Sequence, residues 1–411
     1  MALLDGVNAP TIKVEFDIGN SGTFVLGVSL LGGVDKLGTP VTPNWVQVPS
    51  YDIRAISTRR GRSLENQANQ PGTLTLIVDN HSGTYDPANT SSTWTWAGQT
   101  LLTRGLGIRL SATWNSVQYF IYRGYCEQVQ PDAGMDATVT FTFTDALAFL
   151  GQANLTTIAS SYSGDTTSVR LGRILDAIGW SASLRSLTGS RQMGATTYGN
   201  TALQLADQIE NCEYGRLYAD NLGNIKLLPF ESLLSTTYRF SLSDSQVSGQ
   251  VEYDTIVTNP GTKYLVNSVT INQTTSTSQT ATNASSILRY GTFQLAVDAP
   301  ILNNSDALTL AQIYANKNAL PITRVDHIEY DALGIGTLWG SMLSTDLGDN
   351  VNVNRTTVDG RVQFFTSLVE SINFDITPDN WRVAMDLSPS ARVGLFVLDS
   401  SKLDGTDTLW Y

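Results

Sequence analysis

The chain has 411 residues and a formal net charge of -12, with 15% charged and 41% hydrophobic residues. This length allows two to four domains, each with its own core. The acidic balance disfavours nucleic acid as a bound partner, because phosphate contacts need lysine and arginine. It remains compatible with a channel that DNA passes without adhering to the wall.

Membrane and redox signals are weak. No apolar run approaches the roughly 20 residues of a membrane-spanning helix, and residues 1–10 lack the pattern of a secretory signal. We therefore expect assembly in a cytoplasm without membrane insertion. Cys126 and Cys212 have no metal-binding spacing, so two buried thiols are favoured, although a disulfide between them is not excluded.

Residues 1–150 are predicted to form a first β domain. Thr11–Ile18 alternates apolar and polar side chains, and several later runs are rich in β-branched and aromatic residues. Turn-forming residues separate these runs. A short helix with Thr144 as its N-cap is expected to close the segment at Gly151.

Residues 151–235 are predicted to form a central α+β domain. One helix is expected from Ser168 to Gly179, and a second from a cap at Asn200 to a stop at Gly215. The segment Arg216–Leu228 then predicts a β-hairpin, because two apolar runs flank a polar turn.

Residues 236–390 are predicted to return to β-structure with one helix, from about Asn304 to Ala319. The polar run Asn272–Ser286 is expected to be a long loop or a mobile surface excursion. Asp359–Gly360 predicts a hairpin turn, and Trp381–Leu387 predicts a final strand.

The sequence contains no recognisable catalytic constellation, so we expect a non-enzymatic protein without catalytic residues, cofactor or metal. His81 and His327 lie outside catalytic or zinc-binding spacings, and nucleophile-elbow, P-loop and Rossmann patterns are absent. The turn from Asp79 to Asp86 does not fit the calcium loop, which favours an Asx-rich turn. Paired carboxylates of a glycosidase are not excluded by counting, but no local pair stands out.

Eight residues are candidates for a subunit or partner interface: Arg59, Arg60, Arg62, Trp94, Trp96, Phe396, Trp410 and Tyr411. The arginine cluster could contact phosphate or a partner, but a solvated strand end or a salt-bridged edge between subunits is favoured. The two tryptophans at 94 and 96 could stack on sugars or dock against a neighbouring subunit. Residues 391–411 are predicted to be an interface arm, because their apolar start and terminal aromatic residues would otherwise be exposed.

Three parts of the sequence together resemble phage tail proteins. The block from Arg60 through Gln70–Pro87 resembles minor tail proteins of phages that infect actinobacteria. The segment Leu203–Leu228 is similar to a helix–hairpin unit of baseplate hub proteins. Motifs from Arg289–Gly291 to Trp381 follow in the order found in such hubs, so the resemblance extends over about residues 50–390.

This resemblance implies a mainly β fold with an α+β insertion, comprising two tail-tube-like β-barrels and a central helix–hairpin domain. It implies a homotrimeric tail-tip hub at the distal end of the virion's tail, assembled in the host cytoplasm. Such a hub joins the tube end to receptor-binding or fibre components and forms part of the channel for DNA ejection. The implied partners are the tail tube or distal tail protein, the C-terminus of the tape-measure protein, and tail fibre or central spike proteins.

Other functions remain open at the level of sequence. A distal tail ring protein shares the tube-like domain but is usually hexameric and shorter. A tip protein that binds host glycans would use Trp94 and Trp96. An enzyme that degrades cell-wall polymers is the third class, and no catalytic residue carries over to this chain from the hub family.

Overall fold

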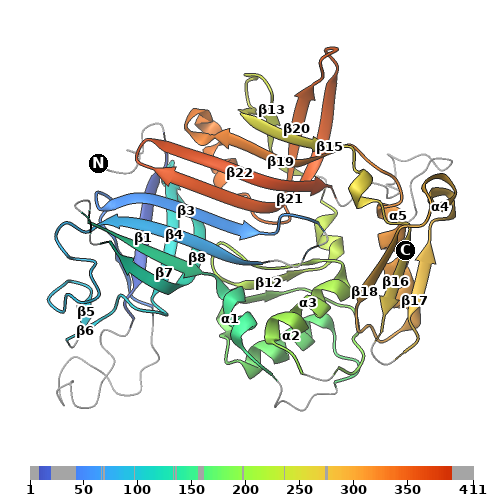
Figure 1. Cartoon of the computed structure of the whole chain (residues 1–411), viewed down its shortest axis with the longest axis horizontal. Coiled ribbons are helices and arrows are strands. Elements are labelled where there is room, and N and C mark those ends of the chain that lie inside the picture. The colour runs from blue at the N-terminus through green and yellow to red at the C-terminus, as the bar shows by residue number, and fades with distance from the viewer. Residues whose placement is uncertain are drawn as a thin grey trace.

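The molecule is built on one large β-sheet, with a helical part below it and a small β–α unit at one end (Figure 1). The computed structural model describes residues 9–390 except 20–42, 66, 68–69, 97, 133, 135–136, 156–161, 197–198, 236 and 274–275. Strands account for most of the regular structure. The predicted class, mainly β with an α+β insertion, is confirmed.

The first part of the sheet is antiparallel throughout, in the order β3-β4-β9-β8-β7-β1-β2. Its strands are β1 (Thr11–Asp17), β2 (Trp45–Gln47), β3 (Ile53–Gly61), β4 (Gln70–Asp79), β7 (Gly107–Trp114), β8 (Val117–Pro131) and β9 (Thr138–Thr144), with a separate pair β5 (Thr95–Trp96) and β6 (Gln99–Thr100). Alternation in β9 turns Phe141 and Phe143 to the buried face, where both rings pack near Phe16 of β1. The alternating patterns in the sequence therefore correspond to one buried face of this sheet.

The second part of the sheet contains the late strands of the chain. They are β13 (Tyr238–Ser243), β14 (Val251–Glu252), β15 (Thr255–Asn259), β19 (Arg324–Asp331), β20 (Asn350–Thr356), β21 (Val362–Thr377) and β22 (Asn380–Pro389). The short helices η4 (Ala332–Gly334), η5 (Gly336–Leu338) and α6 (Trp339–Leu343) follow β19. Trp339 packs on Trp381 with ring centroids 4.8 Å apart, so α6 closes the core of this part.

Strand β21 joins the two parts of the sheet. Its first half pairs with β20, from Val362 to Leu368, and its second half pairs with β3, from Ser371 to Ile376. Along most of its length the other edge pairs with β22. The β-structures at the two ends of the chain are therefore hydrogen-bonded into one sheet.

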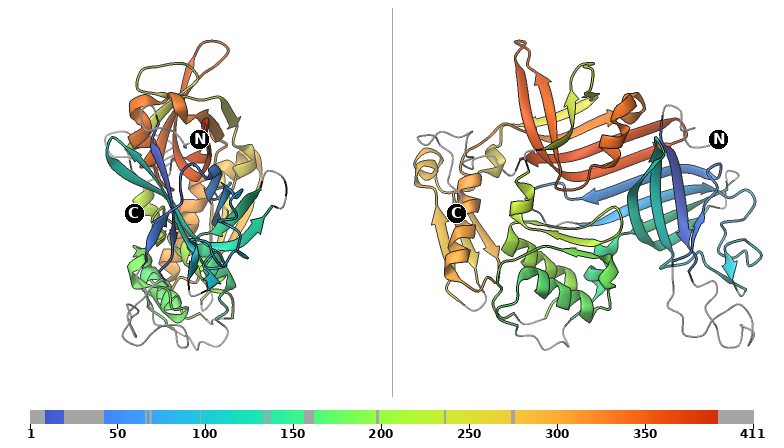
Figure 2. Two further views of the ribbon diagram at one scale, coloured as in Figure 1. Left: turned by 90° about the vertical axis from the view of Figure 1, so that its left-hand side faces the viewer. Right: turned by 180° about the vertical axis from the view of Figure 1, so that it is seen from behind.

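The central part lies below the sheet (Figure 2), and its two predicted helices and its hairpin are present. It contains α1 (Ala146–Gln152), α2 (Thr167–Ala177), η1 (Ala182–Leu184), β10 (Arg185–Leu187), α3 (Ala202–Glu213), β11 (Arg216–Ala219), β12 (Ile225–Leu228) and η2 (Phe230–Leu233). Helix α1, which was predicted to close the first β domain, packs in the core of this part instead. The caps differ from those predicted by one or two residues: Asp145 caps α1 instead of Thr144, Thr166 caps α2 instead of Ser168, and Thr201 caps α3 instead of Asn200. Thr201 is preferred because it forms a reciprocal capping box with Gln204.

The small unit at the end of the molecule lies within the predicted second β domain. It comprises η3 (Thr262–Tyr264), β16 (Ser268–Asn272), β17 (Gln279–Thr282), α4 (Ala284–Tyr290), β18 (Gln294–Asp298) and α5 (Asn304–Lys317). The prediction of a loop over Asn272–Ser286 is wrong, because β17 and the start of α4 lie inside it. Threonine alternation in β17 allows pairing with β16 despite the polar composition.

Two closed, tube-like barrels remain a prediction, because among the described strands no ladder closes either part of the sheet into a ring. The predicted boundaries at residues 150, 235 and 390 also remain predictions. None of the described helices has the length and hydropathy needed to cross a membrane.

Candidate functional site

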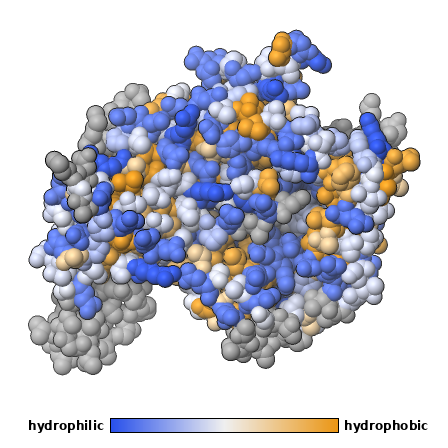
Figure 3. All heavy atoms as spheres, viewed as in Figure 1, coloured by the Kyte–Doolittle hydropathy of each residue, from blue (hydrophilic) through white to orange (hydrophobic). Residues whose placement is uncertain are grey.

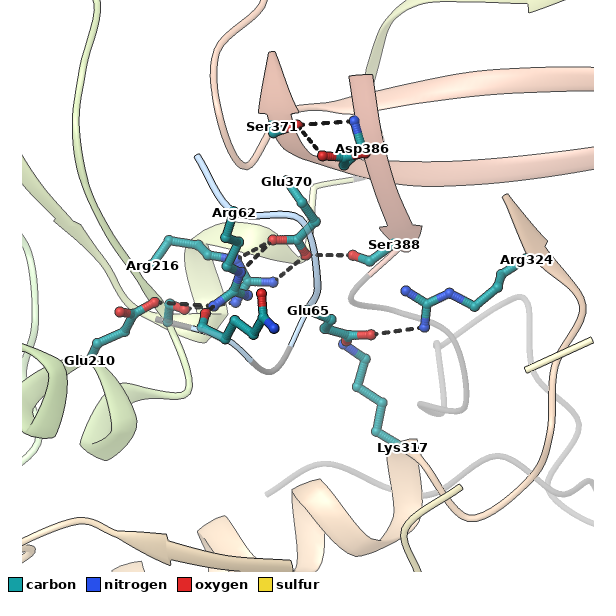
Figure 4. Close-up of polar contacts among 12 residues, drawn as sticks. Arg62, Glu65, Glu210, Arg216, Lys317, Arg324, Glu370, Ser371, Asp386 and Ser388 are labelled. Carbon is teal, nitrogen blue, oxygen red and sulfur yellow. Dashed lines mark hydrogen bonds and ion pairs between the residues drawn. The ribbon is translucent and has the colours of Figure 1, made fainter. Parts of the chain in front are cut away.

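The densest buried charges lie where the two parts of the sheet meet the central part (Figure 4). Strand β3 ends at Gly61, whose φ of 95° directs the chain close against β21. A Cβ at this position would lie 2.1 Å from the carbonyl oxygen of Glu370. The next residue, Arg62, donates its backbone N–H to that same oxygen at 3.0 Å and turns its side chain into the interior.

The carboxylate of Glu370 is the centre of this group. It accepts hydrogen bonds from Arg62 Nε at 2.8 Å, from Arg216 Nη2 at 2.7 Å and from Ser388 Oγ at 2.6 Å. Burial would raise the pKa of Glu370, but attraction to the two arginines holds that pKa well below its ordinary value. Glu370 is therefore a charged acceptor in the interior, shared by cations from β11 and from the end of β3.

A second buried group surrounds Glu65. Its carboxylate binds Lys317 Nζ at 2.6 Å and Arg324 Nη1 at 3.1 Å. Burial would raise the pKa of Glu65, but the two cations lower it below its ordinary value. Because Lys317 ends α5 and Arg324 begins β19, this group ties the small unit to both parts of the sheet. We call both groups together the junction network: Arg62, Glu65, Glu210, Arg216, Lys317, Arg324 and Glu370.

A cavity of about 330 Å³ opens beside the junction network. Asp207 and Glu210, one turn apart on α3, both line it, and burial raises their pKa values to about 6 and about 7. Glu210 Oε1 also lies 3.4 Å from Arg62 Nη1. Since the arginines here are already paired with carboxylates of the same chain, the arrangement fastens segments together.

Comparison with solved structures identifies the fold. The tail protein of Neisseria meningitidis MC58 aligns with a TM-score of 0.57 and 10% identity, over 93% of this chain and 97% of that chain. The 43 kDa tail protein of prophage MuSo2 from Shewanella oneidensis aligns with a TM-score of 0.54 and 13% identity, over 85% of this chain and 96% of that chain. The chain has the fold of prophage tail proteins. No protein-family model and no curated protein sequence matches it.

Within this tail-protein fold, the basic cluster lies differently from expectation. Arg60 and Arg62 are buried, and Arg60 Nη1 binds Asp346 Oδ1 at 2.9 Å. The interpretation of these two as exposed contacts or a solvated strand end is therefore wrong, because partners far along the same chain bind them. Arg59, on the opposite face of β3, is exposed and donates to Ser63 Oγ, so its interface role remains a prediction.

The aromatic interface candidates differ in how far they are buried. Trp94 is 4% exposed and packs against Phe16 and Tyr85 in the core, which excludes it as a surface for sugars or a neighbouring subunit. Trp96, in β5, is half-buried and remains a candidate. The other three, Phe396, Trp410 and Tyr411, lie outside the described residues, as does the predicted arm 391–411.

One constellation superficially resembles a catalytic triad. Asp386 accepts a hydrogen bond from Ser371 Oγ at 2.7 Å and lies 2.8 Å from His327 Nδ1. The carboxylate thus stands between the hydroxyl and the imidazole, whereas a nucleophilic serine needs the imidazole as its direct partner. This arrangement therefore does not activate the serine.

The Asx-rich turn after β4 and the two cysteines make contacts within the chain. The Asp79 carboxylate, which would be a ligand in a calcium loop, is bonded to Arg54 and to His81. No cluster of three or more potential metal ligands occurs in the part of the chain that the structure describes. Cys126 and Cys212 are buried and free, so they do not form a disulfide with one another.

Sequence reasoning missed most of the junction network, because its members lie up to 308 residues apart in the chain. A local signal existed at two positions. Glu370 follows the apolar pair Leu368 and Val369 within a buried stretch of β21, and Glu210 lies beside Ile209 on the buried side of α3. A charge inside a buried pattern predicts a buried partner, but the sequence does not name that partner.

Proposed function

We propose that this protein is a structural, non-enzymatic component of a phage tail, at the hub where the tube end meets receptor-binding or fibre components. It would lie in the virion at the distal end of the tail and form part of the channel for DNA ejection. The observation that carries the proposal is the tail-protein fold, which extends over 85–93% of the chain.

The internal construction supports this role. A hub transmits force between the tube and the host-binding apparatus, so its parts must not move independently. Strand β21 makes one sheet of both β parts, and the junction network fastens the central part and the small unit to it. Buried charge networks of this kind define one arrangement of segments, because a displaced partner leaves an unpaired charge in the interior.

The proposed assembly is a homotrimer that contacts the tail tube or distal tail protein, the tape-measure C-terminus, and fibre or spike proteins. Two β parts per chain, in three chains, would present six units to a sixfold tube. The net charge of -12 suits a wall past which DNA slides. Assembly would take place in the host cytoplasm.

Light scattering of the purified protein tests the stoichiometry. A mass of three times the 44.5 kDa chain is expected for the hub. A hexamer would favour the distal tail ring protein instead. The control is the same measurement across a dilution series, which separates a defined trimer from weak aggregation.

The glycan-binding alternative now rests on Trp96 alone of the two tryptophans. Binding of the protein to host envelope glycans, lost in Trp96→Ala without a change in thermal stability, would favour it. The enzymatic alternative predicts release of soluble fragments from host envelope preparations. We expect none, and release of such fragments by the purified protein would contradict the structural role.

A further inference from the structure

A slot lies between one face of helix α3 and the outer edge of strand β18. Four residues at helical spacing, three on α3 and one at its C-cap, line the cavity of about 330 Å³ on this side: Asp207, Glu210, Asn211 and Tyr214. Residues 295–298 of β18 line the opposite wall. Figure 1 shows the two elements side by side, and Figure 3, in the same view, shows hydrophilic residues mixed with smaller hydrophobic areas in this region.

Strand β18 is an edge strand, because the order of the small sheet is β17-β16-β18. The residue before it, Phe293, accepts a hydrogen bond at its carbonyl oxygen from Ser268 N at 3.1 Å, so odd-numbered residues turn their main-chain groups toward β16. Even-numbered residues turn theirs toward the slot, where Asp298 O accepts a hydrogen bond from Asn211 Nδ2 at 3.3 Å. The N–H and C=O of Ala296 are thus left to pair with a further strand.

The walls of the slot carry carboxylates that no cation of the described residues neutralises. Asp207 forms no hydrogen bond or ion pair with the described residues, and burial raises its pKa to about 6. The carboxylate of Asp298, on the other wall, is exposed and accepts a hydrogen bond from the uncharged Asn272. A cation supplied by another molecule would therefore be attracted to both walls.

The inner end of the slot has an unused donor. Arg62 is 4% exposed, and its Nε and Nη1 bind the carboxylate of Glu370 and the carbonyl oxygen of Gln67. Its Nη2 is buried without an acceptor among the described residues. Because Arg62 lines the cavity, a ligand that enters it can supply the missing acceptor.

An extended peptide with basic side chains meets all three requirements. Its main chain carries the N–H and C=O groups that pair with an edge strand, and a carbonyl oxygen that Arg62 can bind. Its lysine or arginine side chains compensate Asp207 and Asp298. A metal ion would satisfy neither the free edge of β18 nor the donor of Arg62.

We propose that the slot between α3 and β18 binds an extended, basic segment of another tail protein, which adds to β18 as a further strand and places a lysine or arginine beside Asp207. This inference rests on the proposed function in taking the partner to be another tail component, and it adds the surface used and the chemistry recognised. Since the slot adjoins the junction network, the bound segment would contact the central part, the small unit and the end of β3 together.

The test measures fluorescence anisotropy of a dye-labelled peptide of three Lys-Val repeats, with both ends blocked, mixed with the full chain at pH 7. Saturable binding is expected. A Glu-Val peptide of the same length should not bind, and neither should the Lys-Val peptide with every main-chain nitrogen methylated, which keeps its charge but loses its N–H donors. No saturable binding of the Lys-Val peptide overturns the proposal, as does equal binding of either control peptide.

A matched pair of variants tests the acidic wall. Asp207→Asn should raise the dissociation constant of the Lys-Val peptide about tenfold, whereas Asp379→Asn, in the exposed turn between β21 and β22, should leave it unchanged. In the wild type, affinity should rise as the pH rises through 6, because Asp207 must ionise to attract lysine. Equal dissociation constants for the two variants contradict the proposal, as does a wild-type affinity that does not change between pH 5 and pH 7.

Hydrogen exchange locates the bound peptide without any substitution. Saturating Lys-Val peptide should slow exchange of the Ala296 amide, which faces the slot, and should leave the opposite edge of the sheet, β17, unchanged. Slowing at β17 alone, or no slowing at Ala296, would mean that the peptide does not add to β18.

The two proposals fail in different ways. A chain that is found in tails but does not bind the peptide keeps the hub role and loses the slot. A chain that binds the peptide along β18 but is missing from tails loses the hub role and keeps the slot as a peptide-binding site.

Discussion

Neutralising Glu370 is expected to destabilise the protein more than any single change of a surface charge. The substitution Glu370→Gln preserves the size of the side chain and removes the negative charge that Arg62 and Arg216 share. Both arginines remain in the interior, where water does not compensate them.

The expected loss is about 3–5 kcal/mol in the free energy of unfolding, the range for breaking a buried ion pair from one side. The loss should depend on pH. The folded pKa of Glu370 is lowered, so its stabilising contribution is present above the ordinary unfolded value of about 4.3 and is lost as the pH falls toward the folded value. The difference between wild type and variant should therefore shrink in acid.

Urea unfolding followed by tryptophan fluorescence measures this loss at pH 7 and at pH 3. The control is Asp359→Asn, which removes an ion pair of the exposed hairpin tip and should leave the unfolding midpoint unchanged. A loss below about 1 kcal/mol for Glu370→Gln at pH 7 would refute the reasoning. It would mean that the junction network does not fasten the parts of the chain.

Three further predictions concern the sheet and its core. Gly61→Ala should lower the free energy of unfolding more than Gly105→Ala does. Both glycines have similar positive φ values, but only at Gly61 would an added Cβ collide with backbone atoms. Equal unfolding midpoints for the two variants would contradict this. Trp94→Ala should cost about 3–5 kcal/mol as a buried aromatic truncation, and an unchanged midpoint in urea would return Trp94 to the surface candidates. The pKa of His327 is raised to about 9, chiefly by its hydrogen bond to Asp386, so its stabilising contribution is complete below about pH 6.5 and is lost as the pH rises through 9. His327→Gln should flatten the decline in the free energy of unfolding at high pH. The change should be roughly 1 kcal/mol, because water screens this part-exposed group. Identical pH profiles of wild type and variant would be evidence against it.

Local patterns predicted the elements that local interactions determine. The hairpin β11–β12 was bounded correctly, because its two apolar runs and its turn lie within Arg216–Leu228. Helix caps were displaced by one residue where two neighbouring residues both suit the cap position, as at Asn200 and Thr201. The strand β17 was missed because its threonines gain pairing from β16, which no local window contains.

The candidate site was harder to predict, because its geometry arises from contacts between distant segments. The arginines at positions 59, 60 and 62 read as one basic cluster, yet alternation in β3 and the turn at Gly61 send two of them inward and one outward. Their acceptors, Asp346 and Glu370, come from the opposite end of the chain. A sequence without aligned relatives gives no information on such pairings, whereas the resemblance to tail hubs anticipated the fold.

The central claim is best tested by counting this protein in intact particles. A gold-labelled copy should be seen only at the distal end of the tail, with three copies per particle by quantitative imaging. Six copies, label along the tube or on peripheral fibres, or particles without label would contradict the proposed hub.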